Sequence, residues 1–326
     1  MEAIHADFAL TEEDIKNYRE KGFVLLKQLF SEDMIDHLKQ KVKEQMSKPT
    51  DKYQQGFDKV GYGLCNGDPV IYNLLADPRF SDTMLELTEH NLFFTQGLGF
   101  SLRKVVGTGF SWHIESQSFG FHRTEDYGTT IWAPLNPIDT KRQRGGMRYV
   151  PKNIISGEYM YSYIDPALFN CIDDRIKSGG ISFDDYITLR DGPLNSPGME
   201  ALLDHYAVED DFEPGDALLL DKYVIHRSVK LEDGPLETRE AFSFRFICET
   251  SRYDYARAHW IEIPREYFNT PGPTKFHLEI CENDGDLIVD SSFFDGDRER
   301  RRIRGGRQPY QLLNQPPVAR LVDSGL

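Results

Sequence analysis

The stretch Ala241-Phe242-Ser243-Phe244-Arg245-Phe246-Ile247 is rich in aromatic and branched residues, which favour β-strands. It is the last of a series of similar short stretches separated by turn residues. Such a series is typical of a barrel or a double-sheet jelly roll. The sequence therefore predicts a mainly β protein, with further strands at residues 93–96, 100–106, 129–135, 147–150 and 217–220.

Helices are expected to flank this core at the N-terminal side. Thr11 is a candidate N-cap for a helix that runs to about Lys21, and Gly22 ends it. Residues 23–26 form a short apolar strand, and residues 31–34 begin a second helix with an apolar face.

One catalytic domain is expected over residues 1–326 because no repeat or low-complexity linker divides the chain. Its predicted parts are a helical N-terminal module (1–90) and a jelly-roll core in two pieces (91–153 and 212–250). A lid-like insertion (154–211) separates the two pieces, and a C-terminal extension (251–326) follows them. A long insertion between core strands is usually a lid or an interface. The basic run 298–307 is expected to be solvated or internally paired, since acidic residues precede it.

Composition limits the classes of function. Hydrophobic residues make up 39% and charged residues 28% of the 326 residues, as in ordinary soluble proteins. The net charge of −15 disfavours nucleic acid and anionic membranes as partners. The sequence offers no signal peptide, no membrane-spanning run and no paired cysteines, so a cytoplasmic protein with reduced thiols is predicted.

The most informative motif is Trp112-His113-Ile114-Glu115. In a strand, residues i and i+2 point to the same face, so His113 and Glu115 would meet at one point. His226, after the apolar stretch 217–220 and a turn, would complete the set. Two imidazoles and one carboxylate leave coordination positions open, an arrangement that suits Fe(II) with 2-oxoglutarate and O2 as its other ligands. A strand with two polar residues facing solvent is the alternative for the motif alone.

A fixed cation is needed for the distal carboxylate of 2-oxoglutarate, and arginine serves best. Arg239 lies thirteen residues after His226, at the start of the return strand. Arg245, six residues later, would point to the same face of the strand and is the alternative residue for binding this carboxylate. Either could instead be a surface arginine.

These residues resemble the phytanoyl-CoA dioxygenase family over most of the chain. The resemblance rests on residues 10–26, on Arg144–Pro151, on Phe212–Leu219 and on Arg239–Ser243. It implies a double-stranded β-helix (jelly roll, cupin-like) and an iron- and 2-oxoglutarate-dependent dioxygenase. It places the metal on His113, Glu115 and His226, and the co-substrate on Arg239, Gln96, Lys104 and Ser243. Glu115 departs from the family's usual Asp, and its extra methylene requires the carboxylate to fold back. The carboxylate itself argues against a halogenase.

Four further residues are candidates for contact with substrate: Phe119, Trp132, His122 and Arg148. A role in the core is the alternative for the aromatic residues, and an ordinary loop position is the alternative for His122.

The predicted reaction is oxidation of a small-molecule metabolite, with hydroxylation first and natural-product biosynthesis as the expected setting. Desaturation, cyclisation or epimerisation would use the same cofactors. Two hypotheses of a different kind are a non-catalytic jelly-roll binding protein and a metal-dependent isomerase or hydrolase. Acidic residues of the insertion, Asp173, Asp174, Asp184 and Asp185, favour a polar or cationic substrate. A monomer or a homodimer is expected.

Overall fold

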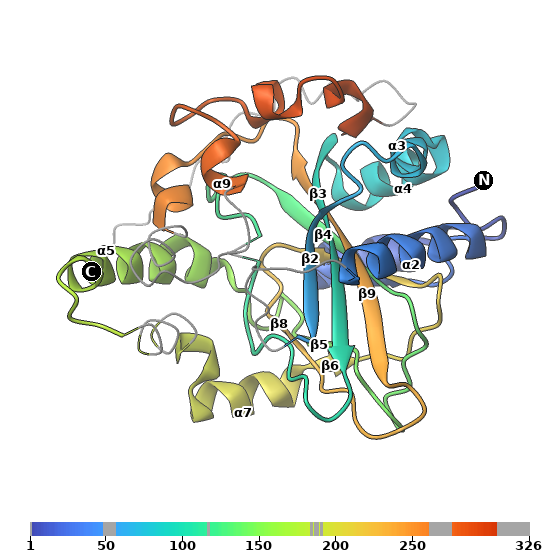
Figure 1. The fold of residues 1–326 in the computed structure, drawn as a ribbon, viewed down its shortest axis with the longest axis horizontal. Helices are drawn as coiled ribbons and strands as arrows, with labels where there is room; N and C mark the ends of the chain where they lie inside the picture. Colours follow the sequence, from blue (N-terminus) through green and yellow to red (C-terminus); the bar gives the residue numbers. More distant parts are fainter. Residues whose placement is uncertain are drawn as a thin grey trace, which may run out of the picture.

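In the computed structural model, the described residues are 2–47, 57–115, 118–182, 185, 189, 192–260 and 276–304. Within them, none of the helices has the length and apolar character to cross a membrane. The mainly β prediction is confirmed: two antiparallel sheets form the centre and helices flank them (Figure 1).

The larger sheet has seven strands. Its order is β1-β7-β4-β9-β3-β10, and β2 also pairs with β3. The strands are β1 Phe23–Leu26, β2 Lys59–Leu64, β3 Leu92–Arg103, β4 Gly128–Pro134, β7 Ala217–Asp221, β9 Thr238–Cys248 and β10 Arg302–Ile303. The stretch predicted at 93–96 and the first part of that predicted at 100–106 are one continuous strand, β3, because Gly97 and Gly99 stay within the ladder with β9. The strand ends at Arg103, and residues 104–106 form a turn.

The smaller sheet has the order β6-β5-β8. Its strands are β5 Met147–Tyr149, β6 Val208–Glu209 and β8 His226–Ser228. His113 extends this sheet by a single antiparallel bridge to His226.

The N-terminal helices form as predicted. Helix α1, Glu12–Lys21, begins with a capping box between Thr11 and Asp14 and ends at Gly22 with φ +79°. Helix α2, Glu32–Met46, is capped by Ser31 and buries Ile35, Leu38 and Val42. Helices α3, Pro69–Ala76, and α4, Pro78–Thr88, complete this layer. Their apolar side chains share one core with the phenylalanines of β9, so these helices cover one face of the larger sheet (Figure 1).

The insertion is partly helical, as expected. It holds a π-helical turn, Met160–Ile164, followed by α5, Asp165–Lys177, and then α7, Pro197–Tyr206. Tyr161 and Leu203 pack with Trp112, Ile114 and Ile225, so the insertion closes over the segment that carries the candidate metal ligands. Of its acidic residues, Asp184 and the side chain of Asp173 lie outside the described structure.

The C-terminal extension is more regular than predicted. It contains α9, Phe276–Glu279, and three 3₁₀ turns at Ile288–Asp290, Ser292–Phe294 and Arg298–Arg301. Its last strand, β10, pairs with β3. Arg301 is buried, binds Asp297 and donates to the carbonyl of Thr95. Internal pairing of the basic run is therefore confirmed up to Arg304, and its end lies outside the described residues.

Three cysteines, Cys65, Cys248 and Cys281, are free, in agreement with the prediction of reduced thiols. The side chain of Cys171 lies outside the described structure.

Candidate metal centre

His113 and His226 face each other at the edge of the smaller sheet, where a single bridge joins them. Each backbone N–H donates to the other residue's carbonyl at 2.9 Å, and the ring centroids are 4.2 Å apart. The expectation of a regular strand through 112–115 is wrong. The chain makes one bridge at His113 and then turns, because the Glu115 carbonyl accepts hydrogen bonds from the N–H groups of Ser118 and Phe119.

Both imidazoles are held by their Nδ1 atoms. Nδ1 of His113 lies 2.8 Å from the carbonyl of Ser111, and Nδ1 of His226 lies 2.8 Å from that of Val224. Because a carbonyl can only accept, Nδ1 carries the hydrogen and Nε2 keeps its lone pair. Metal-binding histidines are oriented in this way.

Glu115 is buried and turns its two oxygens toward different partners. Oε1 lies 3.9 Å from Nε2 of His226, and Oε2 lies 3.8 Å from a terminal nitrogen of Arg245. Burial alone would raise the pKa of Glu115, but Arg245 and His226 bring it below its usual value. Burial lowers the pKa of His226. An ionised carboxylate and a neutral imidazole are the forms that bind a metal ion.

The three side chains therefore converge without forming a closed coordination sphere. In the described part of the chain, no three His, Cys, Asp or Glu side chains already have the spacing of a metal site. Oxygen and imidazole-nitrogen donors with open positions nonetheless fit a divalent iron ion.

Arg239 is the residue predicted to bind the distal carboxylate of 2-oxoglutarate, and its surroundings fit that role. It is 1% exposed, its Nε donates to the carbonyl of Gly145 at 2.6 Å, and its guanidinium lies 5.4 Å from the ring centre of Trp132. Its Nη1 is buried and finds no hydrogen-bond partner among the described residues. Burial lowers the pKa of Arg239 to about 10, so the group stays charged at neutral pH. A buried, unpaired cation is costly, and a bound carboxylate would remove that cost.

The other predicted co-substrate residues lie in different surroundings. Gln96 and Ser243 are buried, and their neighbours across the ladder are Arg245 and Trp132 respectively. Lys104 follows the end of β3 and binds Glu237 at 2.8 Å and Asp233 at 3.4 Å, two carboxylates of the hairpin before β9.

The four residues proposed to contact substrate do not lie together. Trp132 is beside Arg239. Phe119 packs in the C-terminal core, and His122 lies against it at 5.3 Å between ring centres. Arg148 binds Asp204 at 2.7 Å on the insertion. These assignments remain predictions.

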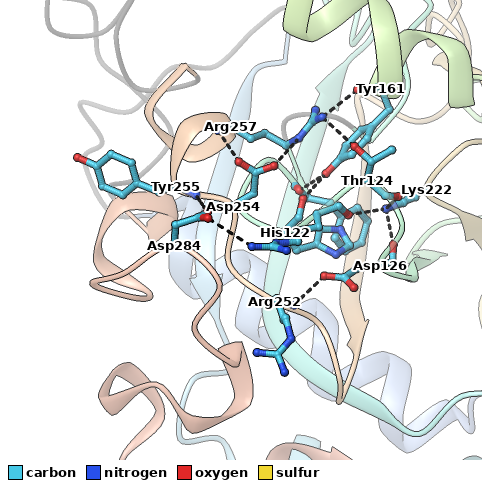
Figure 2. A network of polar contacts seen from close by, with 12 residues as sticks. His122, Thr124, Asp126, Tyr161, Lys222, Arg252, Asp254, Tyr255, Arg257 and Asp284 are labelled. Carbon is cyan, nitrogen blue, oxygen red and sulfur yellow. Dashed lines mark hydrogen bonds and ion pairs between the residues drawn. The ribbon is translucent and has the colours of Figure 1, made fainter.

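A polar network holds the segment from His122 to Asp126, which follows the motif in the chain (Figure 2). The ammonium of Lys222 donates to the carbonyls of Thr124 and Asp126 and lies 4.6 Å from the ring centre of Tyr161. Arg257 stacks on Tyr161 at 3.8 Å and donates to Thr124 at 3.2 Å. Nothing in the sequence pattern identified these residues, since Lys222 and Arg257 stand in no motif. The network joins the loop after Glu115 to the insertion and to the C-terminal extension.

Solved structures show the same architecture. The chain resembles the non-haem alpha-ketoglutarate-dependent carbocyclase SnoK from nogalamycin biosynthesis at a TM-score of 0.54 and 16% identity, covering 85% of this chain and 93% of SnoK. It resembles the epimerase SnoN from the same biosynthesis, solved with Fe3+, alpha-ketoglutarate and nogalamycin RO, at a TM-score of 0.53 and 15% identity. That match covers 74% of this chain and 85% of SnoN.

No protein-family model and no curated protein sequence matches the chain. At this level of identity the likeness shows the fold: a double-stranded β-helix of the kind found in iron- and 2-oxoglutarate-dependent enzymes. The fold implied by the sequence resemblance is thereby confirmed.

Proposed function

We propose that this protein is an Fe(II)- and 2-oxoglutarate-dependent oxygenase that oxidises a small-molecule metabolite. The observation that carries the proposal is the buried Arg239, whose Nη1 finds no hydrogen-bond partner among the described residues. It lies on β9, the strand whose Arg245 pairs with the candidate metal ligand Glu115. Three metal-binding side chains alone fit several classes of enzyme. Together with a buried site for an anion, they fit the class of enzymes that binds a dicarboxylate next to its metal.

Each residue then has a defined task. His113, Glu115 and His226 would hold the iron, which when bound supplies the redox chemistry that couples O2 to decarboxylation of 2-oxoglutarate to succinate and CO2. The backbone carbonyls of Ser111 and Val224 keep both Nε2 atoms available. Arg239 binds the distal carboxylate, and Trp132 beneath it excludes water and strengthens the ion pair. Gln96 and Ser243, buried beside Arg245 and Trp132 in the ladder, are assigned to the co-substrate as well.

Hydroxylation is the leading outcome within this class. Cyclisation and epimerisation are supported as alternatives by the carbocyclase and the epimerase whose folds the chain shares. The position of the substrate relative to the metal decides between these outcomes.

The test is anaerobic titration of the purified protein with Fe(II) and 2-oxoglutarate. We expect a metal-to-ligand absorption band and one bound iron and one bound 2-oxoglutarate per chain. Glu115→Gln and His226→Gln should each lower iron affinity at least tenfold. Glu240→Gln on β9 and His205→Gln on α7 serve as matched controls and should leave iron affinity unchanged.

Two results would contradict the proposal. An absent band without 2-oxoglutarate binding would favour a binding protein that has lost iron. Turnover that needs metal but no 2-oxoglutarate would favour an isomerase or a hydrolase.

A further inference from the structure

Strand β9 carries two arginines on one face, the buried Arg239 and the partly exposed Arg245. Arg239 and Arg245 are separated by six residues, and alternate residues of a strand share a face. Their Cα atoms are thus about 20 Å apart along the strand. The two guanidiniums also have different neighbours, so they provide two separate cationic positions.

The partners of Arg245 are incomplete. Its terminal nitrogen lies 3.8 Å from Oε2 of Glu115, which is an ion pair but too long for a hydrogen bond. Its Nε has no hydrogen-bond partner among the described residues. The Arg245 side chain is 12% exposed, so part of it remains accessible to a ligand.

Formal charges show what is missing at this face. A bound divalent ion would be neutralised by Glu115 and by one carboxylate of the co-substrate. The other carboxylate would neutralise Arg239. Arg245 would then share its one carboxylate partner, Glu115, with the metal. A largely buried cation of this kind is stabilised by a further anion that offsets its desolvation.

We infer that Arg245 binds a carboxylate of the organic substrate, so that the substrate is a small anionic molecule held next to the metal. The planar fork of a guanidinium binds a carboxylate through two parallel hydrogen bonds, which fixes the orientation of the substrate as well as its charge. The acidic residues of the insertion suggested a polar or cationic substrate, so the negative charge inferred here has the opposite sign. The inference rests on the proposed function, because the charge count includes the metal and the co-substrate.

The test uses the full-length protein with Fe(II) and saturating 2-oxoglutarate under anaerobic conditions. Isothermal titration with acetate and with benzoate, each compared with its neutral amide, measures the preference for a carboxylate at two sizes. Arg245→Gln and Arg239→Gln are a matched pair on the same strand face. The affinity for 2-oxoglutarate is measured in parallel from the absorption band.

We expect the wild type to bind at least one carboxylate tenfold or more tightly than the corresponding amide. Arg245→Gln should abolish this preference and change the dissociation constant of 2-oxoglutarate less than threefold. Arg239→Gln should weaken 2-oxoglutarate binding at least tenfold and retain the preference.

The inference is overturned if neither carboxylate is preferred over its amide in the wild type, or if Arg245→Gln keeps the preference. It is also overturned if Arg245→Gln loses 2-oxoglutarate while Arg239→Gln keeps it, because Arg245 is then the co-substrate anchor. Failure of the proposed function is distinct: wild-type protein would bind no 2-oxoglutarate with Fe(II), whatever its preference for carboxylates.

Discussion

The two faces of β9 differ in how completely their side chains find packing or hydrogen-bond partners. On one face Phe242, Phe244 and Phe246 pack against one another and against the helical layer, with ring centres 4.7 and 6.4 Å apart along the strand. On the other face the buried Arg239 and the largely buried Arg245 each have one nitrogen without a hydrogen-bond partner among the described residues. The apolar face stabilises the fold, whereas the polar face carries the residues of the proposed binding site and leaves some of their nitrogens without partners.

The largest expected effect is on the apolar face. Phe244→Ala should lower the free energy of unfolding by about 3–5 kcal/mol, because it leaves a cavity beneath the helices. Urea denaturation measures the change. Phe293→Ala, at a ring that is 40% exposed, is the control and should cost much less. Similar losses at both positions would mean that the helical layer contributes little to stability.

Arg239→Met, on the polar face, should change ligand binding much more than it changes the stability of the fold. Methionine has a similar volume and removes a buried cation that lacks a complete set of partners, so the free energy of unfolding should stay within about 1 kcal/mol of wild type or rise. Binding of 2-oxoglutarate should weaken by about 1.5–3 kcal/mol, roughly ten- to a hundredfold. Urea denaturation and the absorption titration together measure both quantities. A large loss of stability with intact 2-oxoglutarate binding would make Arg239 a structural residue.

A third change tests how tightly the apolar face is packed. A Cβ at Gly97 on β3 would lie 2.5 Å from Cζ of Phe242 and 2.7 Å from the carbonyl oxygen of Leu64. Gly97→Ala should therefore lower the free energy of unfolding by about 1–3 kcal/mol. Gly198→Ala on α7 meets no atom within 4 Å and should be neutral or stabilising. Equal effects in thermal denaturation would show that the packing at Gly97 relaxes freely.

The smallest effect concerns His122, a buried histidine that is not one of the candidate metal ligands. Burial, with the charges of Lys222 and Arg257, holds the pKa of His122 well below its usual value. The unfolded chain takes up a proton near pH 6.5 and the folded chain does not, so this histidine lowers stability as the pH falls below about 6.5.

His122→Phe should remove that dependence. Between pH 7 and 5.5 the wild type should lose about 1 kcal/mol more free energy of unfolding than the variant. His205→Gln, at an exposed position, is the control and should follow the wild type. Parallel pH profiles of wild type and His122→Phe would show that His122 is charged within the fold.

Much of the architecture could be predicted because its causes are local. The Thr11 cap, the Gly22 stop and the strands on either side of His226 follow from residue type and spacing. The segment 112–115 could not be assigned correctly, since its conformation depends on one bridge to His226 and a turn at Glu115. Strand β10 was missed because its two residues pair with β3, some two hundred positions earlier in the chain.

The sequence by itself determined the residue types at the candidate centre and the parity that places Arg239 and Arg245 on one face of a strand. Only the tertiary structure decided which partners these groups have. Lys104 binds two hairpin carboxylates, Arg148 binds the insertion, and Arg245 faces Glu115. Parity depends on the backbone of one strand, whereas charge partners depend on how distant segments pack. For that reason the incomplete pairing of Arg245, and the anionic substrate inferred from it, became visible only in the fold.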